Sequence, residues 1–151
     1  MSGFFDFAGT VIDRICRTLF GVSPEPKSVR ETSYQRRNII ASQYSILPDA
    51  PKISGRPPCW IGLKHGKYLY EFQVLKTEGE IRIYILAAPS YGKHKITAHL
   101  THRWFDDVCR IHYVCCGGRS PTDFDDAKEF ARLWCRYTTH YVETGQDLFA
   151  S

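Results

Sequence analysis

Residues 60–89 read WIGLKHGKYLYEFQVLKTEGEIRIYILAAP, and this stretch decides the fold class. It contains three runs rich in aromatic and β-branched residues, at 60–65, 68–76 and 80–88. In the second run the apolar Tyr70, Phe72 and Val74 alternate with polar residues, as in a half-buried strand. A short link containing glycine joins the second run to the third. The pattern therefore predicts an antiparallel meander.

Helical patterns lie on both sides of this meander. Residues 33–45 suit a helix, and the proline-rich loop 47–58 separates that helix from the first strand. After the meander, apolar residues at helical spacing predict a helix over 124–143, with Thr122 and Asp125 resembling a capping box. These elements predict an α+β domain with about four strands. We expect one core that contains Phe72, Ile83, Phe130 and Trp134.

The N-terminal segment has a different character. Its apolar residues recur every three or four positions over residues 4–22, which predicts an amphipathic helix. Charged residues interrupt the apolar stretch, so it is neither a signal peptide nor a membrane span. Its apolar face is expected to pack on the domain or on a second copy in a homodimer, with membrane-surface docking as the alternative. Residues 1–27 are expected to form this helix and a linker, and residues 28–151 are expected to form the domain.

The charge and the cysteine content indicate which kinds of partner and which cellular compartment to expect. The net charge is +4, from 20 basic and 16 acidic residues, and no long run of like charge indicates a nucleic-acid site. The chain has six cysteines. Without an export signal, a cytoplasmic protein with free thiols is expected.

Chemistry-bearing residues concentrate in residues 90–118, which mix short apolar runs with His, Asp, Cys and Gly. This stretch is predicted to be irregular and to hold the functional site. Its His and Cys spacing does not match a structural zinc site, and no metal or other cofactor is expected. A disulfide is disfavoured by the compartment. A two-histidine phosphoesterase needs two His-x-Thr/Ser copies, and only His99-Leu-Thr101 is present.

A cysteine nucleophile is the remaining catalytic hypothesis. Cys109 follows His102, Asp106 and Asp107 and precedes Arg110. Such neighbours can receive a proton, stabilise a thiolate or support an oxyanion. The competing interpretation is that Cys109 is a small buried core residue, as most free cysteines are.

A family resemblance favours the nucleophile. The order of a helix, a loop, the strand opening Trp60-Ile-Gly62, a strand ending at Pro89, His102-Arg-Trp104, acidic residues and Cys109 resembles the bacterial ubiquitin-conjugating-enzyme-like family. A helix with Trp134 that ends in Tyr141-Val-Glu-Thr-Gly145 extends the resemblance, which covers about residues 33–147.

The resemblance implies a fold and a set of roles. The fold would be ubiquitin-conjugating-enzyme-like, Cys109 the thioester-forming nucleophile, and His102 an oxyanion donor or loop anchor. Asp107, or its neighbour Asp106, would take the proton of an incoming amine. The sequence before Cys109 lacks the glycine usual in the family, so Cys115 and Cys116 stay open as alternative thiols.

The resemblance also implies a setting. Stand-alone members of the family occur in CBASS anti-phage operons beside a cGAS-like nucleotidyltransferase, whose C-terminal glycine is the acyl group. The expected function is a transferase that passes this acyl group to an amine. The alternative is a non-catalytic adaptor that binds proteins on the same scaffold. A Cys109 buried away from any groove would favour the adaptor.

Overall fold

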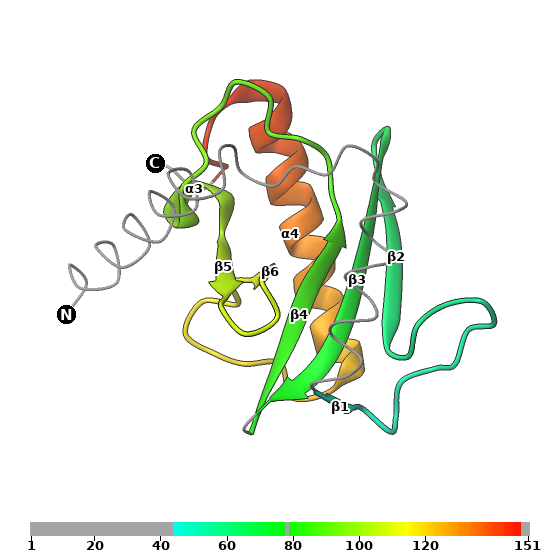
Figure 1. Ribbon diagram of the computed structural model, residues 1–151. Coiled ribbons are helices and arrows are strands. Elements are labelled where there is room, and N and C mark those ends of the chain that lie inside the picture. Colours follow the sequence, from blue (N-terminus) through cyan, green and yellow to red (C-terminus); the bar gives the residue numbers. More distant parts are fainter. Residues whose placement is uncertain (1–43, 78, 149–151) are drawn as a thin grey trace.

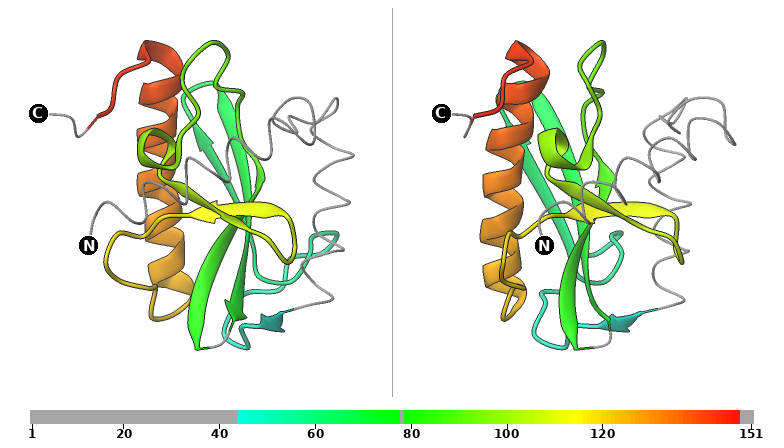
Figure 2. Two further views of the ribbon diagram at one scale, coloured as in Figure 1. Left: turned by 60° about the vertical axis from the view of Figure 1, so that its left-hand side comes forward. Right: turned by 90° about the vertical axis from the view of Figure 1, so that its left-hand side faces the viewer.

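The protein folds into one antiparallel sheet with a long helix across one face (Figures 1 and 2). The computed structural model describes residues 44–77 and 79–148. The elements are β1 (Ser45–Ile46), β2 (Trp60–His65), β3 (Tyr68–Thr77), β4 (Glu80–Ala87), α3 (Ala98–Thr101), β5 (Arg103–Asp106), β6 (Ile111–Val114) and α4 (Phe124–Thr144). The structure confirms the α+β class; the ubiquitin-conjugating-enzyme-like identity stays a prediction.

Strand β3 is the centre of the sheet. Strands β1 and β2 pair with the same edge of β3, β4 pairs with its other edge, and the order continues through β6 to β5. Every pairing is antiparallel, which confirms the meander predicted for residues 60–88. The predicted helix 33–45 is wrong at its end, because Ser45 belongs to β1 and pairs with Lys76. Its other residues up to 43, and the predicted helix 4–22, lie outside the described residues.

The predicted irregular stretch 90–118 is more regular than expected. It contains α3 and the β5–β6 hairpin, which extend the sheet beyond the expected four strands to six. Only Tyr84 of β4 pairs directly with β6, at Tyr113. The polar residues of this stretch concealed two short strands, because their side chains find partners inside the fold.

Helix α4 begins and ends through caps. The side chain of Asp123 accepts a hydrogen bond of 2.8 Å from the backbone N–H of Asp126. Gly145, at φ 72°, donates its N–H to the carbonyl of Tyr141. The helix confirms the predicted range, but the predicted cap at Thr122 is wrong by one residue.

The main core lies between α4 and the sheet. The ring of Trp134 meets Tyr70 and Phe72 edge-on, with ring centroids 6.0 and 5.8 Å apart. Ile83 is fully buried in the same cluster and Phe130 packs against it. The expected core of four residues is therefore confirmed.

The other face of the sheet has a second, smaller apolar cluster. Its buried members come from β3, β4, β6 and the loop before β6: Leu75, Tyr84, Leu86, Cys109 and Ile111. The sheet is therefore apolar on both faces, and Cys109 belongs to the face away from α4.

Gly62 allows a tryptophan ring to lie flat on strand β2. A Cβ atom at Gly62 would come within 2.2 Å of the Trp60 ring. Because the ring is held between this strand and the guanidinium of Arg56, 4.4 Å from its centroid, it has little room to move. We expect Gly62→Ala to lower the free energy of unfolding by about 1–3 kcal/mol.

Urea denaturation checks this prediction. Gly118→Ala is the matched control, because nothing lies within 4 Å of the Cβ it would add. Equal stabilities of the two variants would show that the Trp60 ring moves aside without cost.

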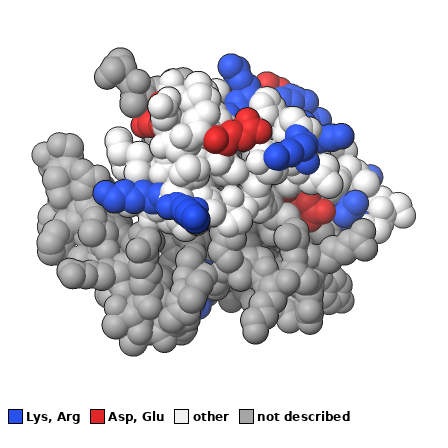
Figure 3. Space-filling view, turned by 90° about the horizontal axis from the view of Figure 1, so that it is seen from above, with Lys and Arg blue, Asp and Glu red and all other residues white. Residues whose placement is uncertain are grey.

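Among residues 44–77 and 79–148, no helix combines the length and apolar character needed to cross a membrane. Basic and acidic side chains both occur on the face seen in Figure 3, with uncharged residues between them. Among the described residues of that face, side chains of the two charges are interspersed.

Candidate functional site

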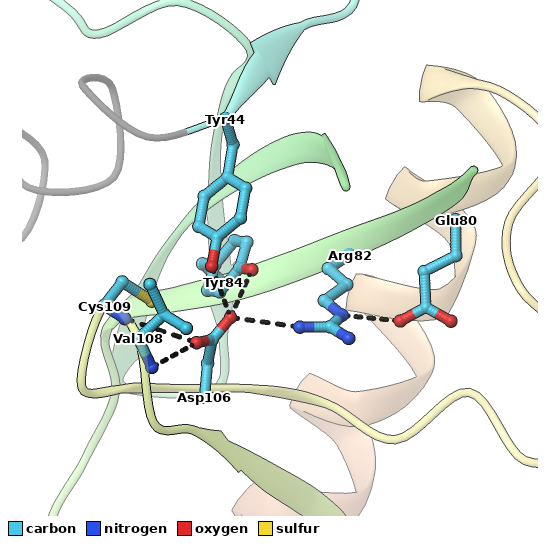
Figure 4. A network of polar contacts seen from close by, with 7 residues as sticks. All are labelled: Tyr44, Glu80, Arg82, Tyr84, Asp106, Val108 and Cys109. Carbon is cyan, nitrogen blue, oxygen red and sulfur yellow. Dashed lines mark hydrogen bonds and ion pairs between the residues drawn. The ribbon is translucent and has the colours of Figure 1, made fainter. Parts of the chain in front are cut away.

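Asp106 organises the loop between β5 and β6 (Figure 4). One carboxylate oxygen, Oδ1, accepts hydrogen bonds from the backbone N–H groups of Val108 at 2.9 Å and Cys109 at 3.2 Å. The other, Oδ2, accepts from the hydroxyls of Tyr44 and Tyr84, at 3.0 and 2.8 Å. The Asp106 side chain is nearly inaccessible to solvent, so its contacts are structural.

The network also balances the charge of Asp106. The guanidinium of Arg82 donates to Oδ2 at 3.0 Å and reaches Glu80 with its Nε. Burial alone would raise the pKa of Asp106, but the hydrogen bonds from Tyr84, Cys109 and Tyr44 outweigh burial and hold that pKa below its usual value. Asp106 is therefore a buried carboxylate that fixes the loop.

Cys109 lies beneath this network and is 2% exposed. Burial raises the pKa of its thiol to about 11, and the negative charge of Asp106 acts in the same direction. A nucleophilic cysteine needs the opposite, an accessible and stabilised thiolate. The expectation of an accessible thiol at Cys109 is therefore wrong, because Asp106 and the second apolar cluster enclose it.

Asp107, the third expected site residue, lies at the surface of the β5–β6 loop. It is exposed in the loop, while its neighbour Asp106 makes the contacts described above. Because Cys109 is buried, an exposed Asp107 has no reacting thiol at this loop to serve.

His102, the other expected site residue, has several features of a functional residue. Its backbone is left-handed at φ 47°, a strained conformation for a residue with a side chain. Its carbonyl accepts hydrogen bonds from the indole N–H of Trp134 at 3.0 Å and from the backbone N–H of Cys115 at 2.9 Å. These contacts hold His102 at the junction of α3 and β5.

The imidazole of His102 is available as a base. Burial lowers the pKa of His102 and outweighs the negative charge of Asp147, which acts in the opposite direction, so the neutral form of the ring is favoured at pH 7. Its ring packs edge-on against Tyr137, with centroids 4.1 Å apart. Among the described residues, the buried Nε2 has no hydrogen-bond partner.

His102 and Cys115 line the same cavity. Beyond the last ladder pair, Arg103 and Val114, the backbone N–H of Cys115 donates to the carbonyl of His102 at 2.9 Å. This hydrogen bond holds the backbones of the two residues together where the hairpin ends. A cavity of about 220 Å³ opens beside them, between the hairpin and α4. The hairpin thus places the predicted histidine beside a cysteine other than the predicted one.

The remaining cysteines are less suited to reaction. Burial raises the pKa of Cys116 and of Cys135 to about 12 in each case. Cys59 is 2% exposed and its pKa is raised by burial. All five cysteines in the described part of the chain are free thiols. Cys115, half-buried at the cavity, is the best placed of them.

Comparison with family models, with curated proteins and with solved structures found no match for this chain. The site therefore has to be interpreted from its own geometry. Within residues 44–77 and 79–148, no three His, Cys, Asp or Glu side chains are grouped to hold a metal ion. A thiol and a neutral imidazole at a shared cavity are what the described residues offer for chemistry.

Sequence reasoning placed His102 with Cys109, whereas the structure brings His102 to one cavity with Cys115. The missing information was the β5–β6 hairpin. Beyond the pairing of Arg103 with Val114, the N–H of Cys115 bonds to the carbonyl of His102, and both residues line one cavity. The alternation of residues 103–106 and 111–114 was the available signal, although each strand has only four residues.

Proposed function

We propose that this protein is a cysteine-dependent acyl carrier and transferase in which Cys115 forms the thioester and His102 is the base. The shared cavity is the observation that carries the proposal, because it places a half-buried thiol beside a neutral imidazole with an unpaired Nε2. A thiol and an imidazole that line one cavity are the groups from which a cysteine nucleophile and its base are built.

The chemistry follows from these two groups. His102 takes the thiol proton of Cys115, and the sulfur attacks the carbonyl carbon of an activated acyl group. The leaving group then departs with the proton that His102 held. An amine then attacks the thioester carbonyl, the carbon–sulfur bond breaks, and the proton of the amine passes through His102 to the Cys115 thiolate. Each step uses only a proton and an electron pair, so no bound cofactor takes part.

The acyl donor follows from the family resemblance alone. It is the C-terminal glycine of a partner protein, here a cGAS-like nucleotidyltransferase in an anti-phage operon. The nucleophile proposed here, Cys115, differs from the cysteine that matches the family motif, which is Cys109. The burial of Cys109 and the exposure of Asp107 support moving both roles away from the β5–β6 loop.

A glycine-ended peptide thioester tests the proposal. The folded protein is expected to gain the mass of the peptide through a bond that hydroxylamine cleaves. Cys115→Ser should lose this adduct, while the matched Cys109→Ser should keep it. His102→Ala should slow its formation by roughly 100-fold or more, because it removes the general base.

Intact-mass spectrometry and peptide mapping give the readout. Loss of the adduct in Cys109→Ser, with retention in Cys115→Ser, would return the nucleophile to Cys109. An adduct that survives in both variants and in Cys116→Ser would reject a thioester function at this site.

A second function, a non-catalytic protein-binding adaptor, is favoured by the burial of Cys109 and by the β5–β6 loop. Asp106 holds this loop rigidly, and Val108 at its tip is 70% exposed. A preorganised apolar side chain loses little conformational freedom on binding a partner. If the protein is an adaptor, Val108→Asp will weaken binding to the nucleotidyltransferase in calorimetry, and Cys115→Ser will leave that binding unchanged.

A further inference from the structure

The walls of the cavity beside Cys115 are apolar. On the side of α4 they are formed by Phe130, Leu133, Trp134 and Tyr137. Of the described residues that line the cavity, none is Lys, Arg, Asp or Glu. A donor that carried a charge next to its reacting carbonyl would lose hydration here and gain no ion pair in return.

The size of the cavity limits what it can hold. Its volume is about 220 Å³. An apolar cavity of roughly 150 Å³ is enough to bind benzene. The cavity beside Cys115 therefore has room for one aromatic ring or a short branched or linear alkyl group, and a long chain would extend into solvent.

One wall of the cavity is incompletely packed. Leu133 is 44% exposed although it is an apolar residue on α4, while Trp134 beside it is 3% exposed. An alkyl group in the cavity would cover part of this exposed leucine. Burial of apolar area favours such binding by roughly fourfold for each methylene group.

We propose that the acyl donor of this protein carries a short apolar group next to its reacting carbonyl, and that the cavity binds this group. The inference rests on the proposed function and specifies its substrate class. In the transfer step, the Cys115 sulfur forms a bond to the carbonyl carbon, the bond from that carbon to the leaving thiol breaks, and the proton passes through His102 to the leaving thiolate. The apolar group in the cavity holds the carbonyl beside the sulfur.

Two series of thioesters test the inference and separate its two sources. One series carries acetyl, hexanoyl or dodecanoyl groups, which represent a free acyl chain. The other carries tripeptides ending in Leu-Gly, Ala-Gly or Asp-Gly, which represent a protein C-terminus. The rate of Cys115 acylation is measured by intact mass and divided by the rate for free cysteine with the same compound.

We expect hexanoyl to react at least tenfold faster than acetyl, or Leu-Gly at least tenfold faster than Asp-Gly. A preference within the first series alone would assign the cavity to a fatty acyl chain. A preference within the second alone would assign it to an apolar residue before a C-terminal glycine. Either result supports the inference.

Variants of α4 link the preference to the cavity. Leu133→Phe narrows the cavity and is expected to remove the preference for hexanoyl or Leu-Gly. Arg136→Ala is the matched control, since Arg136 is exposed one turn further along α4 and does not line the cavity. It should keep both the rates and the preference.

The negative outcomes are distinguishable. Equal normalised rates across both series, with Cys115 still acylated, would overturn the inference and leave the proposed function standing. A preference that survives in Leu133→Phe would also overturn it, because the group would then bind elsewhere. Failure of every thioester to acylate Cys115 would reject the proposed function itself.

Discussion

Iodoacetamide applied to the folded protein should alkylate Cys115 at least roughly 100-fold faster than Cys109. A thiol whose pKa is raised to about 11 has roughly 100-fold less thiolate at neutral pH than an ordinary cysteine. Burial of Cys109 also blocks the approach of the reagent. Cys115, by contrast, is half-buried at an open cavity.

Peptide mapping after timed alkylation gives the separate rates. Cys135 is the internal control for a buried thiol, because it is 1% exposed and its pKa is about 12. Cys109 should react as slowly as Cys135, and denaturation should make all six thiols equally reactive. Alkylation of Cys109 as fast as that of Cys115 would contradict the arrangement described above.

Replacing Asp106 should have the largest effect on stability. Asp106→Ala is expected to lower the free energy of unfolding by about 3–5 kcal/mol, because it removes a buried carboxylate that accepts hydrogen bonds from two tyrosine hydroxyls, two backbone N–H groups and Arg82. The variant leaves Arg82 without its buried carboxylate and deprives the hydroxyls of Tyr44 and Tyr84 of their acceptor. Asp107→Ala is the matched control, and an exposed loop substitution should change stability by less than about 0.5 kcal/mol.

Chemical denaturation at several pH values tests this in a second way. Because the pKa of Asp106 is lowered in the folded state, its stabilising effect is present above its unfolded pKa of about 3.9. That effect is lost as the pH falls through the lower folded pKa. The stability difference between wild type and Asp106→Ala should therefore be constant near neutral pH and should shrink under acid conditions. A difference independent of pH down to the acid limit would show that Asp106 is not ionised in the fold.

The sequence predicted the parts of the fold that have strong periodic patterns. Strands β2, β3 and β4 and helix α4 are long enough for alternation or helical spacing to be evident. The β5–β6 hairpin has only four residues in each strand, which is too short for a clear alternation. In addition, β5 ends in the buried Asp106, and a charged residue is expected to be exposed. Only the positions of Tyr44, Arg82 and Tyr84 explain why that carboxylate is buried.

The candidate site was predictable only in part. The sequence singled out His102 by its setting, but the position of His102 depends on a left-handed backbone and on Trp134, which lies 32 positions later. Cys109 had suitable neighbours in sequence. In space, those neighbours enclose it. A charged residue near a cysteine in sequence therefore gave no information on whether the thiol is exposed.

The order of these partners along the chain has a consequence for assembly. The side chains that bind Asp106 all precede it, at Tyr44, Arg82 and Tyr84, so the hairpin can dock on the meander before α4 leaves the ribosome. The carbonyl of His102 acquires its indole donor only once Trp134 has been synthesised. The loop around Cys109 is thus completed first, and the cavity with Cys115 last. Chains stalled on the ribosome before Trp134 emerges should already protect the Val108 and Cys109 amides from hydrogen exchange, and unprotected amides in these chains would refute this sequence of events.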